Sequence, residues 1–373
     1  MKIIANIGTA VLSFIYFILK LFPSGKKITL ISRQSDDIPL DVQLLIDDEN
    51  EILKNYKLIP LCKTMGKGLF QSFLYLFHIF RQMYHLATSK VVVLDSYCIP
   101  VSILKHKKQL RIVQMWHALG LMKKAGFSIL DNEEGRSKSM AEALKMHNNY
   151  DFILTSSDAC KPAFSEVFNA DINKILTYPL PRLDYMKSKD KKDETIRKIM
   201  DRYDFLKNKD NILYAPTHRK NEEDLGEKIN ELIKEIDFEK YNLIVKCHPV
   251  SNIDMTSNNQ ILLDNEFSSL EMMTVSDIVI TDYSALIYEG IIMNKKIYFY
   301  AFDLDKYLDA RGFFIDYVNE LPGQKHRSAA SLFEDIKKNK YDFGEMTDFA
   351  QKYVDIDNDN CTYRIQEFVK SQA

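Results

Sequence analysis

The chain has 373 residues, 46% hydrophobic and 27% charged, so it is long enough for two globular domains and too apolar to be a disordered protein. Its 50 Lys and Arg residues nearly balance its 52 Asp and Glu residues, which argues against the basic surface of a nucleic-acid-binding protein. Its five cysteines are scattered and form no C-x-x-C pair, which argues against a disulfide framework and a zinc site and favours a reducing cytosol.

The N-terminal segment, residues 1–24, is expected to form an apolar helix. Residues 3–22 read IIANIGTAVLSFIYFILKLF, which is long enough to span a bilayer, and no small-residue cleavage site follows. Three interpretations stay open: a spanning helix, a helix lying on the membrane, and a helix packed on the protein. We favour contact with the cytoplasmic face of the membrane, because Lys20, Lys26 and Lys27 gather where anionic headgroups would lie.

Short β-branched runs alternate with helical stretches along the rest of the chain, a pattern typical of α/β folds with parallel sheets. A dense run of charges at residues 187–210 indicates a junction. We therefore predict two Rossmann-like domains facing a cleft, residues 25–188 and 189–373, with the last helix able to cross back onto the first domain. The strands are predicted at 26–33, 90–96, 111–116, 151–157, 211–217, 241–249, 277–284 and 295–301.

A helix is predicted at residues 70–87, where Phe70, Phe73, Leu74 and Phe77 recur at helical spacing. We expect this apolar stripe to pack on a sheet. A membrane-surface role, supported by the basic residues of its C-terminal half, is the alternative.

Polar residues follow four of the predicted strands. Because ligands of parallel sheets bind at the carboxyl ends of the strands, these residues are the candidate site. They are His117 after the third strand, Thr217, His218 and Arg219 after the fifth, Lys246 and His248 at the end of the sixth, and Asp282 and Ser284 at the end of the seventh.

His117 is a candidate general base, because an imidazole near its ordinary pKa can accept a proton from an attacking hydroxyl at neutral pH. A buried histidine with a purely structural hydrogen bond is the alternative. Lys123 and Lys124, which follow a few residues later, indicate an anionic ligand nearby.

The other candidates suit a phosphate-rich ligand. His248 can donate to a phosphate oxygen, with Lys246 as a nearby positive charge. Ser284 stands where a strand runs into a helix, and the N-terminus of a helix attracts anions. Asp282 is expected to orient a partner or to cap that helix.

Several motifs are absent. The sequence has no Gly-rich phosphate-binding loop, and no D-x-D or other carboxylate cluster at metal spacing stands at the four strand exits that carry the candidate site. We therefore expect a transferase that uses no metal and no cofactor.

The ordered motifs YHLATSKVVVLDS, QMWHALGLMKKAGF, YAPTHR, VKCHP, TDYSALIYEG and RGFFIDYVNELPG resemble those of the CDP-glycerol glycerophosphotransferase family, over residues 84–323. This resemblance implies a two-domain glycosyltransferase-B architecture and a peripheral protein at the cytoplasmic side of the cell membrane. It implies transfer of glycerol phosphate from CDP-glycerol to a hydroxyl of a lipid-linked or polymeric glycan acceptor, with release of CMP. No nucleic-acid partner is expected.

Carried over to this chain, the resemblance makes His117 the base that activates the acceptor hydroxyl. The diphosphate of the donor would be held by His248 and Ser284 and contacted by Arg311. Thr217 and Arg219 would line the donor pocket. The chain departs from the usual family pattern in lacking a glycine directly after His117 and in having Ala285 where a second serine is common.

Alternative functions remain at this point. CDP-ribitol could replace CDP-glycerol as the donor, or the acceptor could be a capsule or glycoprotein chain. A nucleotide-sugar glycosyltransferase and a non-catalytic binding module are further alternatives. The length of the chain favours an enzyme that adds one or a few units, like a primase, over a polymerase.

Overall fold

The computed structural model describes residues 2–66, 68–219, 223–247 and 257–373. Two compact units make up the chain. Unit 1 consists of residues 1–119, 125–184 and 357–373, and unit 2 of residues 120–124 and 185–356. The predicted limit between residues 188 and 189 falls close to Tyr185, where the long segment of unit 2 begins.

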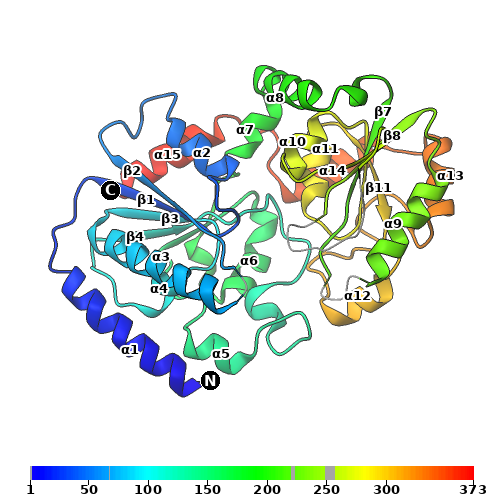
Figure 1. The fold of residues 1–373 in the computed structure, drawn as a ribbon. Helices are drawn as coiled ribbons and strands as arrows, with labels where there is room; N and C mark the ends of the chain where they lie inside the picture. The colour runs from blue at the N-terminus through cyan, green and yellow to red at the C-terminus, as the bar shows by residue number, and fades with distance from the viewer. Residues whose placement is uncertain (1, 67, 220–222, 248–256) are drawn as a thin grey trace. The chain divides into compact units, whose positions relative to one another are not determined.

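Unit 1 contains a parallel six-stranded sheet in the order β2-β1-β3-β4-β5-β6 (Figure 1). All four residues of β3 are buried, as expected for a strand covered on both faces. The sheet is formed by β1 Lys27–Ser32, β2 Lys57–Cys62, β3 Val91–Leu94, β4 Arg111–Gln114, β5 Phe152–Thr155 and β6 Ile175–Thr177.

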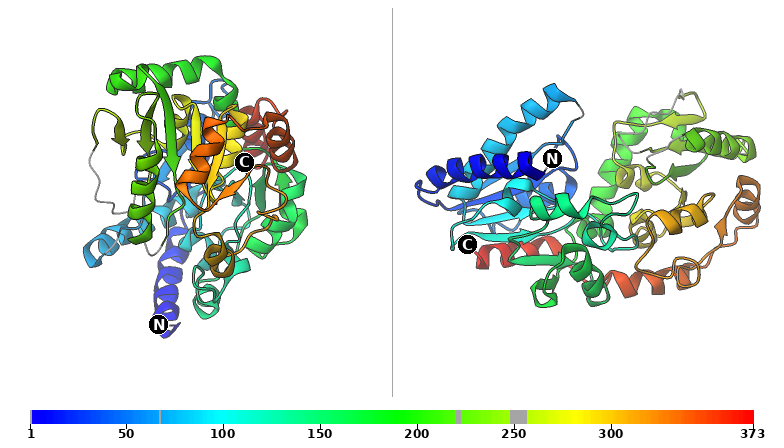
Figure 2. Two further views of the ribbon diagram at one scale, coloured as in Figure 1. Left: turned by 90° about the vertical axis from the view of Figure 1, so that its right-hand side faces the viewer. Right: turned by 90° about the horizontal axis from the view of Figure 1, so that it is seen from below.

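The helices of unit 1 include the C-terminal helix, which packs on α2 although more than 300 residues separate them in the sequence. In the right-hand view of Figure 2 this helix, α15, lies against the sheet of unit 1. The helices are α1 Lys2–Leu19, α2 Leu40–Asp47, α3 Leu69–Thr88, α4 Ile99–Ile103, α5 Lys138–Ala143, α6 Lys161–Phe168, α7 Arg182–Lys187, which runs into unit 2, and α15 Cys361–Ser371, with 3₁₀ turns at Gly126–Ile129, Asp158–Cys160 and Ile172–Lys174.

Unit 2 contains a second parallel six-stranded sheet, in the order β12-β11-β10-β7-β8-β9. Renumbered within the unit, this is the 3-2-1-4-5-6 order of dinucleotide-binding folds. Its strands are β7 Asp210–Ala215, β8 Tyr241–Val245, β9 Ile261–Leu263, β10 Ile278–Thr281, β11 Lys296–Tyr300 and β12 Lys325–His326. Its helices are α8 Lys189–Arg202, α9 Glu223–Glu235, α10 Ser269–Thr274, α11 Leu286–Ile292, α12 Leu304–Ala310, α13 Ala329–Lys337 and α14 Phe343–Tyr353, with a 3₁₀ turn at Asp204–Lys207.

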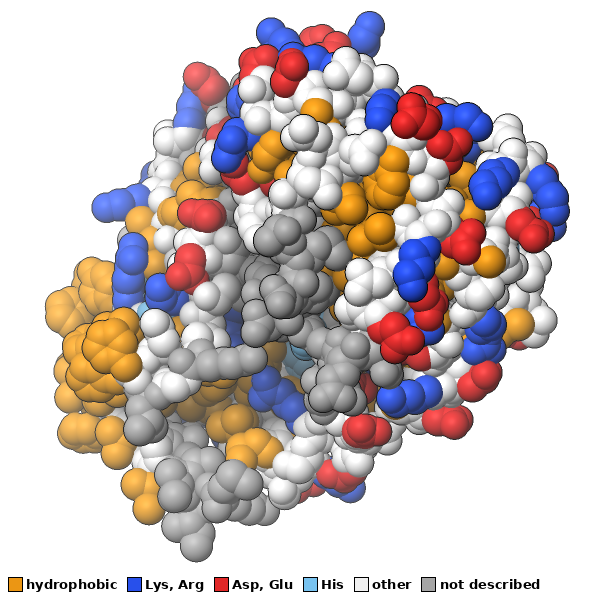
Figure 3. Space-filling model, turned by 45° about the vertical axis from the view of Figure 1, so that its right-hand side comes forward, with side chains coloured by type: hydrophobic (Ala, Val, Ile, Leu, Met, Phe, Trp, Pro, Cys, Tyr) orange, Lys and Arg blue, Asp and Glu red, His pale blue; other side chains and the backbone are white. Residues whose placement is uncertain are grey.

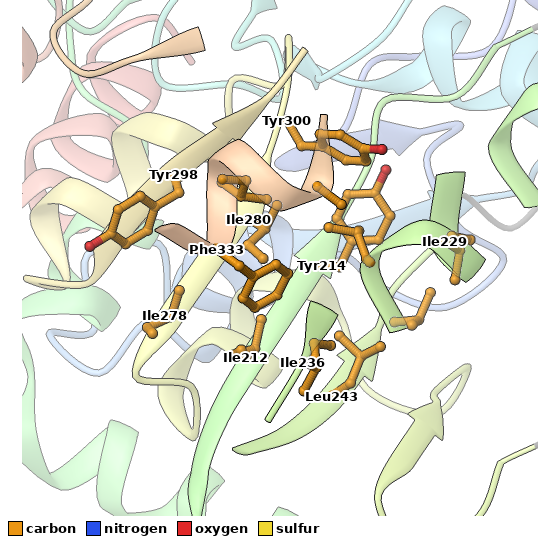
Figure 4. Packing of buried hydrophobic residues seen from close by; sticks show 14 of the residues in the cluster. Ile212, Tyr214, Ile229, Ile236, Leu243, Ile278, Ile280, Tyr298, Tyr300 and Phe333 are labelled. Atoms are coloured by element: carbon orange, nitrogen blue, oxygen red, sulfur yellow. The ribbon is translucent and has the colours of Figure 1, made fainter. Parts of the chain in front are cut away.

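The core of unit 2 fills the space between its sheet and helices α9 and α13. Side chains from β7, β8, β10 and β11 meet Ile229 of α9, Ile236 just after that helix and Phe333 of α13 (Figure 4). Tyr214 and Tyr300 are fully buried, and the hydroxyl of Tyr300 donates to Glu231 at 2.8 Å. This packing holds the strand ends in fixed register, which positions the residues that follow them.

All eight predicted strands are present, and the expected fold class, two Rossmann-like α/β units preceded by a helix, is confirmed. Within the described residues, no helix is long and apolar enough to cross a membrane.

Helix α3 confirms the predicted helix but corrects the expected direction of its apolar stripe. Phe70, Phe73 and Phe77 are 71%, 56% and 58% exposed, whereas the buried residues of α3 include Met83 and Leu86 in its C-terminal half. The second half packs in the core together with Tyr75 of the first half, whereas Phe70, Phe73 and Phe77 form a surface.

Candidate functional site

The candidate donor site of unit 2 lies where its strand order reverses. Strands β7 and β10 are neighbours, with Ala215 paired to Thr281, and the chain leaves them toward opposite halves of the sheet. Such a switch point opens a crevice at the carboxyl ends of the strands, where ligands of doubly wound sheets bind. Thr217 follows β7 and Asp282 follows β10, so the structure brings two predicted residues together here.

The carboxylate of Asp282 organises this turn. It is fully buried and accepts hydrogen bonds from the backbone N–H of Thr217, at 2.9 and 3.2 Å, and of Tyr283, at 2.5 Å. It also pairs with Arg219 at 2.9 Å. Helix α11 begins only at Leu286 and has no side-chain cap. Of the two roles predicted for Asp282, the geometry therefore supports orienting its partners.

Arg219 is an anchor between two carboxylates. Only 8% exposed, it pairs with Asp303 through two hydrogen bonds of 2.7 and 2.8 Å, and donates to the carbonyl of Thr217 at 2.7 Å. Its guanidinium lies 4.5 Å from the centre of the Phe302 ring. Burial lowers the pKa of Arg219, but Asp282 and Asp303 outweigh burial and raise it. Because one cation faces two anions, this cluster does not by itself attract a phosphate.

Hydroxyl groups at the same turn are better placed to contact an anion. The hydroxyl of Thr217 is buried and has no hydrogen-bond partner among the described residues. A buried hydroxyl without a partner is costly, so a ligand that accepts its hydrogen bond would be favoured. The hydroxyl of Ser284 accepts from the N–H of Leu286 at 3.3 Å and can still donate.

The aromatic support of this turn was not predicted from the sequence. Tyr283 donates to Asp303 at 2.9 Å, and Tyr317 donates to the backbone carbonyl of Asp282 at 2.8 Å. Tyr283 also stacks on Tyr307, with ring centres 3.9 Å apart. Asp303 and Tyr307 follow β11 rather than the switch-point strands. Tyr317 lies in the motif RGFFIDYVNELPG and Tyr283 in the motif TDYSALIYEG, and these two motifs were the available signals.

The end of β8, where Lys246 and His248 were predicted, is only partly described. The ammonium of Lys246 lies 2.7 Å from the carboxylate of Asp264, which also accepts a hydrogen bond from Tyr203 at 2.8 Å. Lys246 is therefore held in an ion pair within unit 2. His248 lies outside the described residues.

In unit 1, the turn after β4 presents His117. Gln114 ends the strand and accepts the N–H of Trp116 at 2.9 Å, and Trp116 has a left-handed backbone with φ of 66°. The indole packs edge-on against Phe168 at 5.2 Å. Nδ1 of His117 lies 2.8 Å from the backbone carbonyl of Asp95. Because a carbonyl only accepts, Nδ1 carries the proton and Nε2 is the nitrogen that can accept one.

The side chain of Asp95, at the end of the neighbouring strand β3, is an unusual buried acid. It is 4% exposed, and its Oδ1 has no hydrogen-bond partner in the described parts of the chain. Burial raises the pKa of this carboxyl to about 6, although hydrogen bonds from Ser32 and Ser96 act in the opposite direction. Asp95 lies in the motif YHLATSKVVVLDS, although no role was predicted for it from the sequence.

The segments that carry Lys123 and Arg311 pair with each other in unit 2. Lys123 forms an isolated antiparallel bridge with Phe313, and Nε of Arg311 donates to the carbonyl of Lys124 at 3.0 Å. The structure thus brings together two segments with basic residues that are far apart in the sequence.

Among the residues that the structure describes, no group of three or more His, Cys, Asp or Glu side chains is arranged to hold a metal ion.

A family model described as CDP-Glycerol:Poly(glycerophosphate) glycerophosphotransferase matches residues 14–371. The chain is 32% identical over 324 residues to the teichoic acid ribitol-phosphate primase of Bacillus spizizenii, covering 83% of this chain and 82% of that one. It is 27% identical over 388 residues to the teichoic acid glycerol-phosphate primase of Bacillus subtilis, covering 99% and 98%.

The fold is also similar to that of a solved structure of the wall teichoic acid polymerase TagF. The TM-score is 0.78 and the identity 19%, over 99% of this chain and 96% of that one. At this level of identity the likeness concerns the fold alone.

Proposed function

Because the chain belongs to the CDP-glycerol:poly(glycerophosphate) glycerophosphotransferase family and is therefore a transferase, we propose that it transfers glycerol phosphate from CDP-glycerol to a hydroxyl of a lipid-linked or polymeric glycan acceptor. The observation that carries the proposal is the hydrogen bond between Nδ1 of His117 and the carbonyl of Asp95. It leaves Nε2 as the basic nitrogen of a histidine at a strand exit, which is what activation of a hydroxyl requires.

In the proposed reaction, Nε2 of His117 removes the proton of the acceptor hydroxyl as its oxygen attacks the β-phosphorus of the donor. A bond forms between that oxygen and the β-phosphorus. The bond from the β-phosphorus to the oxygen bridging the two phosphates breaks, and its electron pair leaves with CMP. Such a transfer depends on positioning and charge stabilisation more than on covalent catalysis.

The donor would be held by the switch point of unit 2. The hydroxyls of Thr217 and Ser284 would donate to the diphosphate, and Arg311 and His248 would add positive charge. Asp282 and Arg219 would position Thr217 and would not bind the diphosphate themselves. Arg219 is already paired with Asp282 and with Asp303. Lys246, which is paired with Asp264, and Lys123 would add positive electrostatic potential around the bound donor.

Ribitol phosphate is the second candidate for the transferred group. The relative at 32% identity is named a ribitol-phosphate primase, whereas that at 27% is named a glycerol-phosphate primase. Both names also favour the addition of one or a few units over polymerisation.

We place this reaction at the cytoplasmic face of the membrane. Helices α1 and α3 pack together in unit 1 and expose large apolar side chains, a surface we call the apolar face. Figure 3 shows a dense group of hydrophobic side chains at the lower left of its view. The apolar face consists of Ile7, Val11, Phe14, Phe17, Ile18, Leu21 and Phe22, with Phe70, Phe73, Leu74, Leu76 and Phe77. A group of exposed apolar side chains flanked by Lys20 and Lys26 suits binding to the surface of an anionic membrane.

The test is release of CMP by the purified protein. CDP-glycerol and CDP-ribitol are offered separately and in competition, with a panel of lipid-linked and polymeric acceptors. His117→Ala should lower the rate by about 100-fold or more, as expected for loss of a general base. His85→Ala, which alters another histidine of unit 1, serves as the matched control. Full activity of folded His117→Ala would exclude the proposed base, and release of CMP from neither donor would exclude the proposed function.

A further inference from the structure

Gln114, the last residue of β4, has a fully buried side chain in the sheet of unit 1. Ile112 and Val113, which precede it in the strand, are buried apolar residues. A buried amide costs free energy unless its oxygen and its nitrogen are hydrogen-bonded. The partners of this amide therefore show what a glutamine at this position stabilises.

The side-chain amide of Gln114 connects the ends of two neighbouring strands. Its Oε1 accepts the N–H of Trp116 at 2.9 Å, and its Nε2 donates to the carbonyl of Ser96 at 3.4 Å. A backbone N–H only donates and a carbonyl only accepts, so these partners fix the orientation of the amide. Ser96 follows β3 and Trp116 follows β4, and the two strands pair with Leu94 opposite Gln114.

Trp116 depends on this support because its backbone is left-handed, with φ of 66°. Bulky residues rarely adopt this conformation, in which the Cβ atom crowds the following carbonyl, and it persists only where the surroundings hold it. The indole packs edge-on against Phe168, but its Nε1 has no hydrogen-bond partner among the described residues. The bond from the backbone N–H to Gln114 is therefore the polar contact that fixes the turn.

The left-handed residue turns the chain so that His117 returns to the end of β3. Nδ1 of His117 lies 2.8 Å from the carbonyl of Asp95, and the imidazole lies against the indole of Trp116, with ring centres 4.2 Å apart. Asp95 and Ser96 are consecutive, so the side chains of His117 and Gln114 bond to successive carbonyls of the same segment. The orientation of the imidazole is thus coupled to the bond between Gln114 and Trp116.

We propose that Gln114 is a positioning residue for the proposed base: its amide fixes the turn at Trp116, which keeps Nδ1 of His117 on the Asp95 carbonyl and Nε2 as the basic nitrogen. This rests on the proposed function, because it takes His117 as the base. Loss of the amide should misplace the imidazole within unit 1 and leave the proposed donor contacts of unit 2 intact. A misplacement of the order of an ångström lowers turnover by about 10- to 100-fold.

Two substitutions at residue 114 separate the hydrogen bond from the volume of the side chain. Gln114→Met keeps a side chain of similar length and removes both hydrogen bonds. Gln114→Glu keeps an oxygen that accepts the N–H of Trp116. Thr155→Val is the matched control, because Thr155 ends the neighbouring strand β5 with a buried hydroxyl that has no hydrogen-bond partner in the described parts of the chain.

The first measurements need no catalytic activity. Hydrogen exchange reports on the amide of Trp116, and NMR of the ring nitrogens reports which nitrogen of His117 carries the proton. The signal of His117 among the eight histidines is the one that His117→Ala lacks. We expect a protected Trp116 amide and a proton on Nδ1 in the wild type, in Gln114→Glu and in Thr155→Val. In Gln114→Met the amide should exchange faster and the proton should move toward Nε2.

The kcat and donor KM of CMP release then measure the effect on the reaction. Gln114→Met should lose kcat about 10- to 100-fold with donor KM unchanged, as expected when an interaction realised in the transition state is lost. Gln114→Glu should recover most of that loss, and Thr155→Val should match the wild type. A purely structural glutamine would change stability without changing the proton position on His117.

A wild-type His117 that carries its proton on Nε2 would overturn the inference whether or not any variant folds, and so would a Trp116 amide that exchanges as fast as an exposed loop. An unchanged kcat in Gln114→Met, a loss of kcat without a change at the imidazole, or an equal loss in Gln114→Glu would also overturn it. If the wild type releases CMP, these outcomes leave the proposed function intact. A wild-type protein that releases CMP from neither donor removes both the inference and the proposed function.

Discussion

Single residues of this chain show how the same strand-exit position serves different purposes. Thr217 and Arg219 lie two residues apart after β7, yet Thr217 has a hydroxyl with no partner in the described residues, whereas the guanidinium of Arg219 is fully occupied. A polar residue at a strand exit is therefore a candidate for ligand binding only after its partners within the fold have been counted.

Arg219→Lys should destabilise unit 2 strongly. An ammonium cannot reproduce the planar contacts with Asp282 and Asp303, so buried carboxylates lose partners, at a cost of about 3–5 kcal/mol. The measurement is urea unfolding monitored in unit 2. Arg202→Lys is the control, because the pair between Arg202 and Glu266 is 59% and 50% exposed and solvent-exposed pairs contribute little to stability. Equal effects of the two substitutions would contradict the anchor role.

Asp95→Asn should stabilise unit 1 at neutral pH and above. Burial raises the pKa of Asp95 to about 6 from an ordinary value of 3.8, so the folded protein binds this proton more tightly than the unfolded chain does. Stability of the wild type is then lost as the pH rises through this window, by about 2–3 kcal/mol in total. Asparagine resembles the protonated carboxyl and avoids that loss.

The measurement for Asp95→Asn is the free energy of unfolding from about pH 4 to pH 8. The advantage of the variant should be largest above pH 6 and should shrink toward pH 4. A constant difference across this range would show that the carboxyl does not titrate as the structure implies.

At the scale of elements, α1 and the residues that follow it are held on unit 1 by polar contacts. The hydroxyl of Tyr16, which is 1% exposed, lies 2.8 Å from Nδ1 of His106. Lys20 donates to the carbonyl of Lys105 at 3.0 Å, and Lys107 donates to that of Phe22 at 2.6 Å. These contacts hold the helix on the protein while Phe14 and Phe17 stay exposed.

Replacing Phe73 and Phe77 of the apolar face with serine should weaken binding to anionic vesicles. Insertion of each phenylalanine contributes about 1.5–3 kcal/mol, so the double variant should bind about 100-fold less tightly or weaker. Flotation with vesicles that contain an anionic lipid measures this. Val318→Ser in unit 2, which removes a side chain that is 49% exposed, is the control. Equal flotation of all three proteins would contradict a membrane role for α3.

The elements that the sequence predicts and those that it does not differ in a physical way. Central strands such as β3 are buried on both faces, so their uninterrupted valines predict them. The edge strand β2 contains Pro60, and β9 and β12 have three and two residues, too short for a pattern to form. In α3 the spacing predicts the helix, but periodicity cannot tell whether a phenylalanine stripe faces a core or a membrane.

The residues of the candidate site likewise fall into those that the sequence predicts and those that it does not. Asp282 and Thr217 were predicted because each directly follows a strand, and parallel topology brings neighbouring strand ends together. Asp303, Tyr317 and Asp95 act through partners that are distant in sequence, and no local pattern identifies such partners.

At the scale of the whole molecule, unit 1 is assembled from three separate segments, and its last segment is the C-terminus of the chain. The N–H groups of Cys361 and Thr362 at the start of α15 donate to the carboxylate of Asp184, at 2.9 and 2.7 Å. Gln366 donates to the carbonyl of Leu45 at 3.1 Å, and Ile365 is fully buried. Unit 1 therefore completes its core only when the last residues are in place, whereas unit 2 needs none of them.

Removal of residues 357–373 should destabilise unit 1 and leave the stability of unit 2 unchanged. Unit 1 loses the buried face of α15, and truncations of single large buried side chains already cost about 2–5 kcal/mol each. We expect faster amide exchange throughout β1, β3 and β4 and loss of CMP release, because the His117 turn depends on those strands. Strands β7 and β10 should keep their protection, and affinity for the CDP-alcohol should persist. Equal loss of protection in both sheets would show that the units fold as one cooperative body, and retained CMP release would show that the base does not require an intact unit 1.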